Sequence, residues 1–276
     1  MSDPILVPAG GGEIVGVSAD RRVEILSDDD TLHATWSRFG PQREGADLHI
    51  HRRHSDLFYV LDGELILRLG VDDKHVHLPA GTLARVPPLV VHGFRNGSDA
   101  DVRYLNFHAP GRRFADYLRA MRDGRPFSYD QHPPPPRGAR PPTDATVRSD
   151  SLLVDSPDLR VTLLADVEEI GIAEASIGRD SPPPHLHRRH VESFYVLEGS
   201  ITFTAGDRQL QAPAGSWVQV PPGVPHTFSS SRGRSARFLD VHTPGCGFGT
   251  FLRGLRDPHD DGELAKVRAA FDQVPA

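Results

Sequence analysis

The chain has 276 residues, and its content of 38% hydrophobic and 25% charged residues is that of a folded globular protein. Its formal net charge of -6 provides no basic field for nucleic acid. No stretch approaches the roughly 20 apolar residues of a membrane span, and the first residues lack the basic and apolar regions of a secretion signal. We therefore expect a cytoplasmic protein whose partners include neither nucleic acid nor membrane.

Glycine and proline are abundant, and cysteine is nearly absent. The 26 glycines and 25 prolines exceed average usage and favour the many turns of an all-β fold. The one cysteine, Cys246, has no partner for an intrachain disulfide. Stability must then come from packing, with metal as the other available source, and a reducing compartment fits this composition.

Most of the predicted elements are short strands. Apolar runs bounded by Gly, Pro or Asp predict strands. In chain order they lie at about 57–61, 64–69, 83–86, 102–107, 160–164, 193–197, 217–220 and 236–241. Helical patterns fit only at about 112–122, 247–256 and 263–273. Many short strands separated by turns indicate a sandwich, jelly roll or barrel.

The second half of the chain repeats the first at an offset of about 134 to 136 residues. A run His-x-His-Arg-Arg-His begins at 49 and again at 185, and a run Phe-Tyr-Val-Leu begins at 58 and again at 194. An offset this long indicates two whole domains in tandem rather than a solenoid. We predict an N-terminal domain at 1–124, a proline-rich linker at 125–149 and a C-terminal domain at 150–276. The linker should be an extended, semi-rigid connector with little packing.

The C-terminal repeat carries the pattern of a metal site. Alternate side chains of a strand share a face, so His185 and His187 can point into one cavity. Glu192 follows among apolar neighbours, where a buried carboxylate needs a cation or a hydrogen-bond partner. His226 returns on a later strand. Three imidazoles and a carboxylate suit a divalent transition metal: Fe, Mn, Ni, Co, Cu or Zn.

The N-terminal repeat predicts a second metal site with two departures. Its ligands would be His49, His51, Asp56 and His92. Aspartate is one methylene shorter than glutamate, so a direct metal bond requires a backbone shift, the alternative being a bridging water. Leu89 stands where the C-terminal repeat has a turn glycine, which removes an easy left-handed position.

These patterns resemble the two sequence motifs of the cupin superfamily. The first is a glycine, H-x-H, three or four residues, glutamate, six residues and a glycine; the second is a glycine, five residues, P-x-G, two residues and a histidine. In the C-terminal half the matching residues are His185, His187, Glu192, Gly199, Gly215, Pro221, Gly223 and His226. The resemblance covers both halves. It implies a bicupin of the quercetin 2,3-dioxygenase type, with one β-jelly-roll barrel per half and a metal in each barrel mouth.

Other residues near these motifs have structural interpretations. We expect His54 and His190 to be rim histidines in the corner between strands, with a supporting or alternative ligand role left open. We expect His108 and His242 to cap the last strand of each barrel. Three phenylalanines are expected in the core and pocket wall, where they would also stack a planar ligand; these are Phe58, Phe194 and Phe228.

Three classes of function stay open. The first and favoured is a dioxygenase acting on a phenolic, flavonol or diketone-like compound, a class that the bicupin resemblance implies, with Glu192 as the base. The second is a non-oxidative isomerase, decarboxylase or lyase that uses the metal as a Lewis acid. The third is a metal- or ligand-binding module without catalysis, because a shared fold does not determine a reaction. A small-molecule substrate is the expected partner, and a homodimer is possible.

Overall fold

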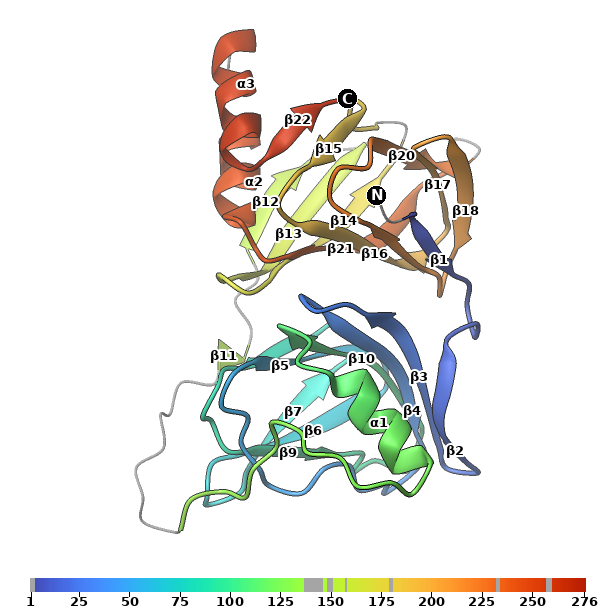
Figure 1. Cartoon of the computed structure of the whole chain (residues 1–276), viewed down its shortest axis with the longest axis vertical. Helices are drawn as coiled ribbons and strands as arrows, with labels where there is room; N and C mark the ends of the chain where they lie inside the picture. The colour runs from blue at the N-terminus through green and yellow to red at the C-terminus, as the bar shows by residue number, and fades with distance from the viewer. Residues whose placement is uncertain are drawn as a thin grey trace. The chain divides into compact units, whose positions relative to one another are not determined.

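The computed structural model describes residues 3–136, 146–147, 151–156, 158–178, 181–231, 234–256 and 260–276. The chain forms two compact units, residues 12–148 and residues 149–276 together with 1–11 (Figure 1). Each unit is built of antiparallel strands in two sheets, which confirms the predicted all-β class with one jelly roll per half. None of the helices in the described residues combines the length and apolar character needed to span a bilayer.

The first unit contains a seven-stranded sheet and a three-stranded sheet. Their strand orders are β11-β8-β5-β10-β4-β3-β2 and β7-β6-β9. The elements are β2 (Glu13–Ser18), β3 (Arg21–Asp28), β4 (His33–Phe39), β5 (Ser55–Asp62), β6 (Glu64–Leu69), β7 (Lys74–Pro79), β8 (Leu83–Val86), β9 (His92–Arg95), β10 (Val102–Ala109), α1 (Phe114–Arg122) and β11 (Thr146–Val147).

The core of this unit lies between its two sheets. Phe58 and Val60 alternate along β5 and therefore share a face. They pack with Leu65 and Leu67 of β6 and with Tyr104 of β10 in one buried cluster. The candidate ligand histidines of this unit are buried but are not part of the cluster.

The second unit has the same architecture, with strand orders β1-β19-β16-β21-β14-β13-β12 and β18-β17-β20-β15-β22. Helix α3 ends at Ala270 rather than at the predicted residue 273, because Gln273 pairs with His187 as a strand. The elements are β1 (Ile5–Val7), β12 (Ser151–Asp155), β13 (Leu159–Asp166), β14 (Gly171–Ile177), β15 (His185–His187), β16 (Val191–Glu198), β17 (Ser200–Ala205), β18 (Arg208–Pro213), β19 (Trp217–Val220), β20 (His226–Ser230), β21 (Ala236–Thr243), α2 (Phe248–Arg256), α3 (Asp261–Ala270) and β22 (Gln273–Pro275).

The start of the chain packs with the second unit, whereas the sequence placed it in the N-terminal domain. In β1, Leu6 pairs with Val218 of β19, and the Arg208 guanidinium donates a hydrogen bond to the carbonyl of Pro4. Strand β1 thereby covers the outer edge of β19, which would otherwise offer unpaired backbone groups. In the first unit, β11 covers the matching edge of β8.

The segment that follows α1 is not the loosely packed connector that we predicted. Ile50 and His132 exchange two backbone hydrogen bonds of 2.9 Å. Tyr129 and Asp130 lie against the strands of the first unit and contact its histidines, as described below. The expectation of little packing is therefore wrong for residues 125–132. Residues 137–145 and 148–149 of the predicted linker lie outside the described residues.

The turn before the last candidate ligand, His92 or His226, has a left-handed residue in both units. Leu89 has φ of 69° and Gly223 has φ of 82°, and each donates its N–H to the carbonyl of the second histidine of H-x-H, over 2.6 Å. The substitution of glycine by leucine has thus not changed the turn, although a side chain costs about 1–2 kcal/mol in this conformation.

Exchanging glycine and a larger residue in these two turns tests the strain at positive φ. We expect Gly223→Ala to lower the free energy of unfolding of the second unit by about 1–2 kcal/mol, because Cβ is strained at positive φ. Leu89→Gly should change that of the first unit by less than about 1 kcal/mol, because relief of strain is offset by a more flexible unfolded chain. Urea unfolding of each variant measures both. A neutral Gly223→Ala would show that the turn relaxes to another conformation.

Candidate metal centres

The C-terminal candidate ligands meet at one point. The Nε2 atoms of His185, His187 and His226 lie 3.7, 3.0 and 2.5 Å from one carboxylate oxygen of Glu192. Strand pairing produces this arrangement, because β15 places both of its histidines on one face and His185 is directly paired with His226. All four side chains are buried.

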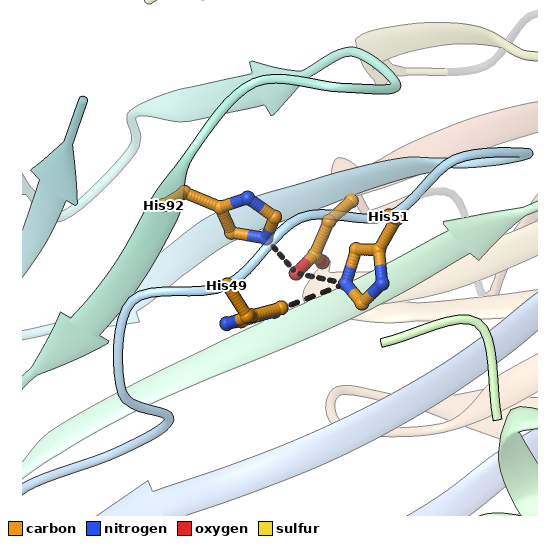
Figure 2. Close-up of side chains that lie close together, drawn as sticks. His49, His51 and His92 are labelled. Carbon is orange, nitrogen blue, oxygen red and sulfur yellow. Dashed lines mark hydrogen bonds and ion pairs between the residues drawn. The ribbon is translucent and has the colours of Figure 1, made fainter. Parts of the chain in front are cut away.

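The N-terminal candidate ligands form an equivalent cluster. The Nε2 atoms of His49 and His51 are 3.2 Å apart, and that of His92 is 3.2 Å from a carboxylate oxygen of Asp56. Figure 2 shows the three imidazoles turned toward a common centre. The shorter side chain of Asp56 thus reaches the cluster, at 3.8 Å from His51.

Backbone carbonyls hold all six imidazoles in the same orientation. In the first cluster, Nδ1 of His49 lies 2.6 Å from the carbonyl of Asp47, and in the second, Nδ1 of His185 lies 2.9 Å from that of Pro183. The four other histidines make the same contact with the carbonyls of Asp130, Val90, Asp272 and Val224. A carbonyl that accepts the Nδ1 proton turns Nε2 toward the cluster, and Nε2 binds a metal through its lone pair once it carries no proton.

Charge balance in the clusters favours ionised carboxylates. Burial opposes the charge of Glu192, but the neighbouring charge of His226 and hydrogen bonds from the three histidines outweigh it and hold its pKa well below the usual value. Burial likewise opposes the charge of Asp56, and the histidines around it hold its pKa well below normal. Burial and the two other histidines lower the pKa of His49 to about 3, which keeps it neutral.

These donors fit a divalent transition-metal ion. Two donors that bind a metal at about 2.1 Å and at right angles lie about 3 Å apart. In each cluster, the ligand atoms of all four residues lie within 4.8 Å of one another. Neutral imidazoles and one carboxylate are the ligands that Fe, Mn, Ni, Co, Cu and Zn prefer. A six-coordinate ion held by four such residues would keep two positions for water or substrate.

A second layer of polar groups supports the first cluster. The Tyr129 hydroxyl lies 2.9 Å from Nε2 of His54 and 3.1 Å from Nδ1 of His108. Asp130 accepts a hydrogen bond of 2.8 Å from the backbone N–H of Arg53, and Nδ1 of His54 lies 3.1 Å from its carboxylate. His54 is therefore a buried, bonded residue and not a rim histidine, because the segment after α1 covers it.

The second unit repeats this layer with one group missing. Asp272 accepts hydrogen bonds of 2.7 Å from the backbone N–H groups of Arg188 and Arg189, as Asp130 does in the first unit. Phe271 occupies the place of the tyrosine and packs on His190 and His242, with ring centroids 5.0 Å away in both cases. His190 is buried and was also wrongly expected at the rim. Neither of its nitrogens has a hydrogen-bond partner among the described residues.

His108 and His242 end their strands as expected, but they also face the clusters. His108 Nε2 lies 3.6 Å from Asp56, and His242 Nε2 lies 3.8 Å from Glu192. Burial is the main reason that the pKa of His242 falls to about 3, and it also holds the pKa of His108 well below normal. Both are neutral imidazoles beside a candidate metal ligand.

The sequence contained a signal for this second layer that we did not use. Tyr129-Asp130-Gln131 returns as Phe271-Asp272-Gln273, each followed by one residue and a proline. The offset of this pair is 142 residues, longer than in the rest of the repeat, because the second copy has an additional helix before it. A comparison of the two halves that extended beyond the predicted helices at 112–122 and 247–256 would have found it.

The difference between Tyr129 and Phe271 predicts that exchanging the two residue types changes the stability of the two units in opposite directions. We expect Tyr129→Phe to lower the free energy of unfolding of the first unit by about 1–3 kcal/mol, since it leaves buried nitrogens of His54 and His108 without a partner. Phe271→Tyr should raise that of the second unit by about 0.5–1.5 kcal/mol, because a hydroxyl there meets nitrogens of His190 and Nδ1 of His242 that have no hydrogen-bond partner among the described residues. Urea unfolding tests both. Destabilisation by Phe271→Tyr would mean that its ring site has no room for an oxygen.

A cavity of about 330 Å³ adjoins the first cluster. It reaches three of the cluster residues, His49, His51 and Asp56. Its polar wall includes Asn106 and His108, while α1 covers one side. Its aromatic lining consists of Phe39, Phe94, Tyr104, Phe114 and Tyr117. The cavity thus offers a candidate metal centre to a planar organic molecule.

Known proteins have sequences and folds similar to those of this chain. The family model described as "Cupin domain" matches the chain twice, at residues 35–108 and 172–242. The chain is 24% identical to the quercetin 2,3-dioxygenase of Bacillus subtilis, over 80% of this chain and 76% of that protein. Its fold is similar to a variant of B. subtilis oxalate decarboxylase (TM-score 0.60, 13% identity, 88% of this chain and 78% of that one). It is also similar to AerE from Microcystis aeruginosa (TM-score 0.61, 16% identity, 86% and 97%).

Proposed function

The chain belongs to the cupin family and has two cupin domains, and on this premise we propose that it is a metal-dependent dioxygenase. Its substrate would be a small aromatic or enolic molecule that chelates the metal of the first unit. The observation that carries the proposal is the cavity, which joins candidate ligands to an aromatic wall. Likeness to a quercetin 2,3-dioxygenase supports the reaction class.

The residues of the first unit supply binding and proton acceptance. The metal, when held by His49, His51, His92 and Asp56, would acidify a bound hydroxyl and offer a free coordination position. Asp56 and His108 both line the cavity. Asp56 is ionised, which is the form that accepts a proton. His108 is neutral, and its Nε2 lies 3.1 Å from the amide oxygen of Asn106, so it offers the cavity an N–H donor.

Glu192, which the sequence predicted as the base, is the counterpart of Asp56 in the second unit. It contacts the three histidines of its own cluster, His185, His187 and His226. The cavity described above has no wall residue from the second unit. We therefore propose the first unit as the place of substrate turnover and keep Glu192 as a metal ligand of the second.

Decarboxylation of an acidic substrate is the second candidate. Arg21 and Arg43 line the same cavity and would attract an anion. In this reaction the metal would act without consuming oxygen. The two candidates share the site. In the first, dioxygen is added to the substrate, and in the second, the substrate loses carbon dioxide.

Oxygen consumption separates the candidates. Protein loaded singly with Fe, Mn, Ni or Co would be mixed with a flavonol, a catechol or a 1,3-diketone in an oxygen-electrode cell. We expect uptake of about one dioxygen per substrate consumed. Carbon dioxide release from an acid without oxygen uptake would favour decarboxylation. Two bound metals with neither reaction across the panel would favour a binding protein.

A further inference from the structure

We propose that Arg21 binds a carboxylate of the substrate, so that the natural ligand is an organic acid that chelates the metal through its other end. This inference rests on the proposed function, because it takes the cavity of the first unit as the substrate site. Arg21 is the first residue of β3 and lines that cavity together with Asp56.

Arg21 lies toward the opposite end of the barrel from the metal ligands. It pairs with Phe39, which pairs with Val102 of β10, whereas Asp56 pairs with His108 of the same strand. Six residues of strand separate these two levels, which is about 20 Å between backbones before the side chains reach inward. A molecule that touches both ends must therefore be elongated.

The guanidinium of Arg21 is held in place by packing. Its Cζ lies 5.8 Å from the ring centroid of Phe39, within range of a cation–π contact. A Cβ added at Gly16 of β2 would lie 3.4 Å from the same atom. The absence of a side chain at residue 16 thus leaves the space that the guanidinium occupies.

Arg21 differs from its neighbours because it has no acidic partner. Arg43, in the same wall, lies 2.7 Å from Asp20, and Arg22, the next residue, lies 2.5 Å from Glu24. Among the described residues, Arg21 forms no ion pair, and its buried Nε has no hydrogen-bond partner. An unbonded buried donor on a cation costs free energy, which an anionic ligand recovers.

The chemistry of the site points to a carboxylate. A guanidinium presents a planar fork that matches the two oxygens of a carboxylate. Three acidic residues line the cavity. Asp56 lies in the candidate metal centre, and Glu44 lies 3.6 Å from Arg95 and 3.9 Å from Arg68. The third, Asp47, has its carbonyl 2.6 Å from Nδ1 of His49 and therefore lies at the end of the cavity where the candidate metal ligands are. The aromatic wall between the two ends suits a ring or an unsaturated chain.

Isothermal titration calorimetry tests the carboxylate contact of Arg21, here called the anchor, without any turnover. The probes are ω-(3,4-dihydroxyphenyl)alkanoates of increasing chain length and their amides, titrated under argon into protein loaded with Mn(II). At the best-fitting length we expect the acid to bind roughly 10- to 100-fold more tightly than its amide. Arg21→Gln should reduce this ratio to about one and leave amide binding unchanged. Arg21→Lys should restore part of the ratio.

Arg43→Gln is the matched control, because Arg43 lines the same cavity but already has a partner. It should keep most of the preference for the acid, and thermal melts should show that both variants are folded. Equal binding of acid and amide by the wild type, or an unchanged ratio in Arg21→Gln, would refute the anchor alone. If no probe binds metal-loaded wild type, both the anchor and the proposed substrate site fail.

Discussion

Replacing His51 with alanine should lower kcat/KM by about 10²- to 10⁴-fold in the reaction identified by the oxygen-uptake assay. His51 offers Nε2 to the first cluster and is fixed from behind by the carbonyl of Asp130. Its loss removes one of three imidazoles, and metal activation is worth several kcal/mol, or a factor of ten per 1.4 kcal/mol. Kinetics and elemental analysis of the same preparation measure turnover and metal per chain together.

His187→Ala is the matched control for this prediction. His187 occupies the equivalent position in the second unit, with its Nδ1 3.1 Å from the carbonyl of Asp272. It should also cost one metal per chain but change kcat/KM by less than about 10-fold, because substrate turnover is proposed for the first unit. The reverse result, with His187→Ala inactive and His51→Ala active, would move the chemistry to the second unit and to Glu192.

Removing the metals should destabilise the protein, and for the second unit the loss should depend on pH. A metal held at 1,000 times its dissociation constant adds about 4 kcal/mol of stability. Without metal, His226 lies 2.5 Å from Glu192, and although burial opposes its charge, the carboxylate raises its pKa above the ordinary 6.5. A raised folded pKa gives stability that is complete below pH 6.5 and is lost as pH rises through the folded value.

Thermal melts with and without a chelator between pH 6 and 9 measure this effect. Metal-free protein should lose stability of its second unit as pH rises, so that chelation costs more at pH 8 than at pH 6. Metal-loaded protein should lack that slope, because the metal replaces the proton on His226. Glu192→Gln should remove the slope from the metal-free protein. A slope that persists in this variant would show that another group titrates.

The sequence by itself determined the all-β fold, its duplication and both sets of candidate ligands. These are consequences of short-range patterns. Alternation along one strand places His185 and His187 on one face, and the repeated turn before His226 returns the third imidazole to them. The same spacing in the first half brought His49, His51 and His92 together. Local periodicity is visible in a single sequence because it depends on neighbouring residues only.

Only the tertiary structure decided what surrounds each cluster. Tyr129 contacts His54 across 75 residues, and Asp272 contacts Arg188 across 84. The repeat marks both segments in the sequence, but it does not predict which residues they contact. The cavity, its unpaired Arg21 and the pairing of β1 with β19 likewise depend on strands that are distant in sequence. The two units carry nearly the same ligands, yet their surroundings differ. Phe271 stands in the second unit where the first has Tyr129, and Asp240 stands where the first has Asn106. Such differences arise where segments distant in sequence pack together. Their packing depends on the shapes and hydrogen-bonding groups of the side chains that meet, which the spacing of residues along the chain does not give.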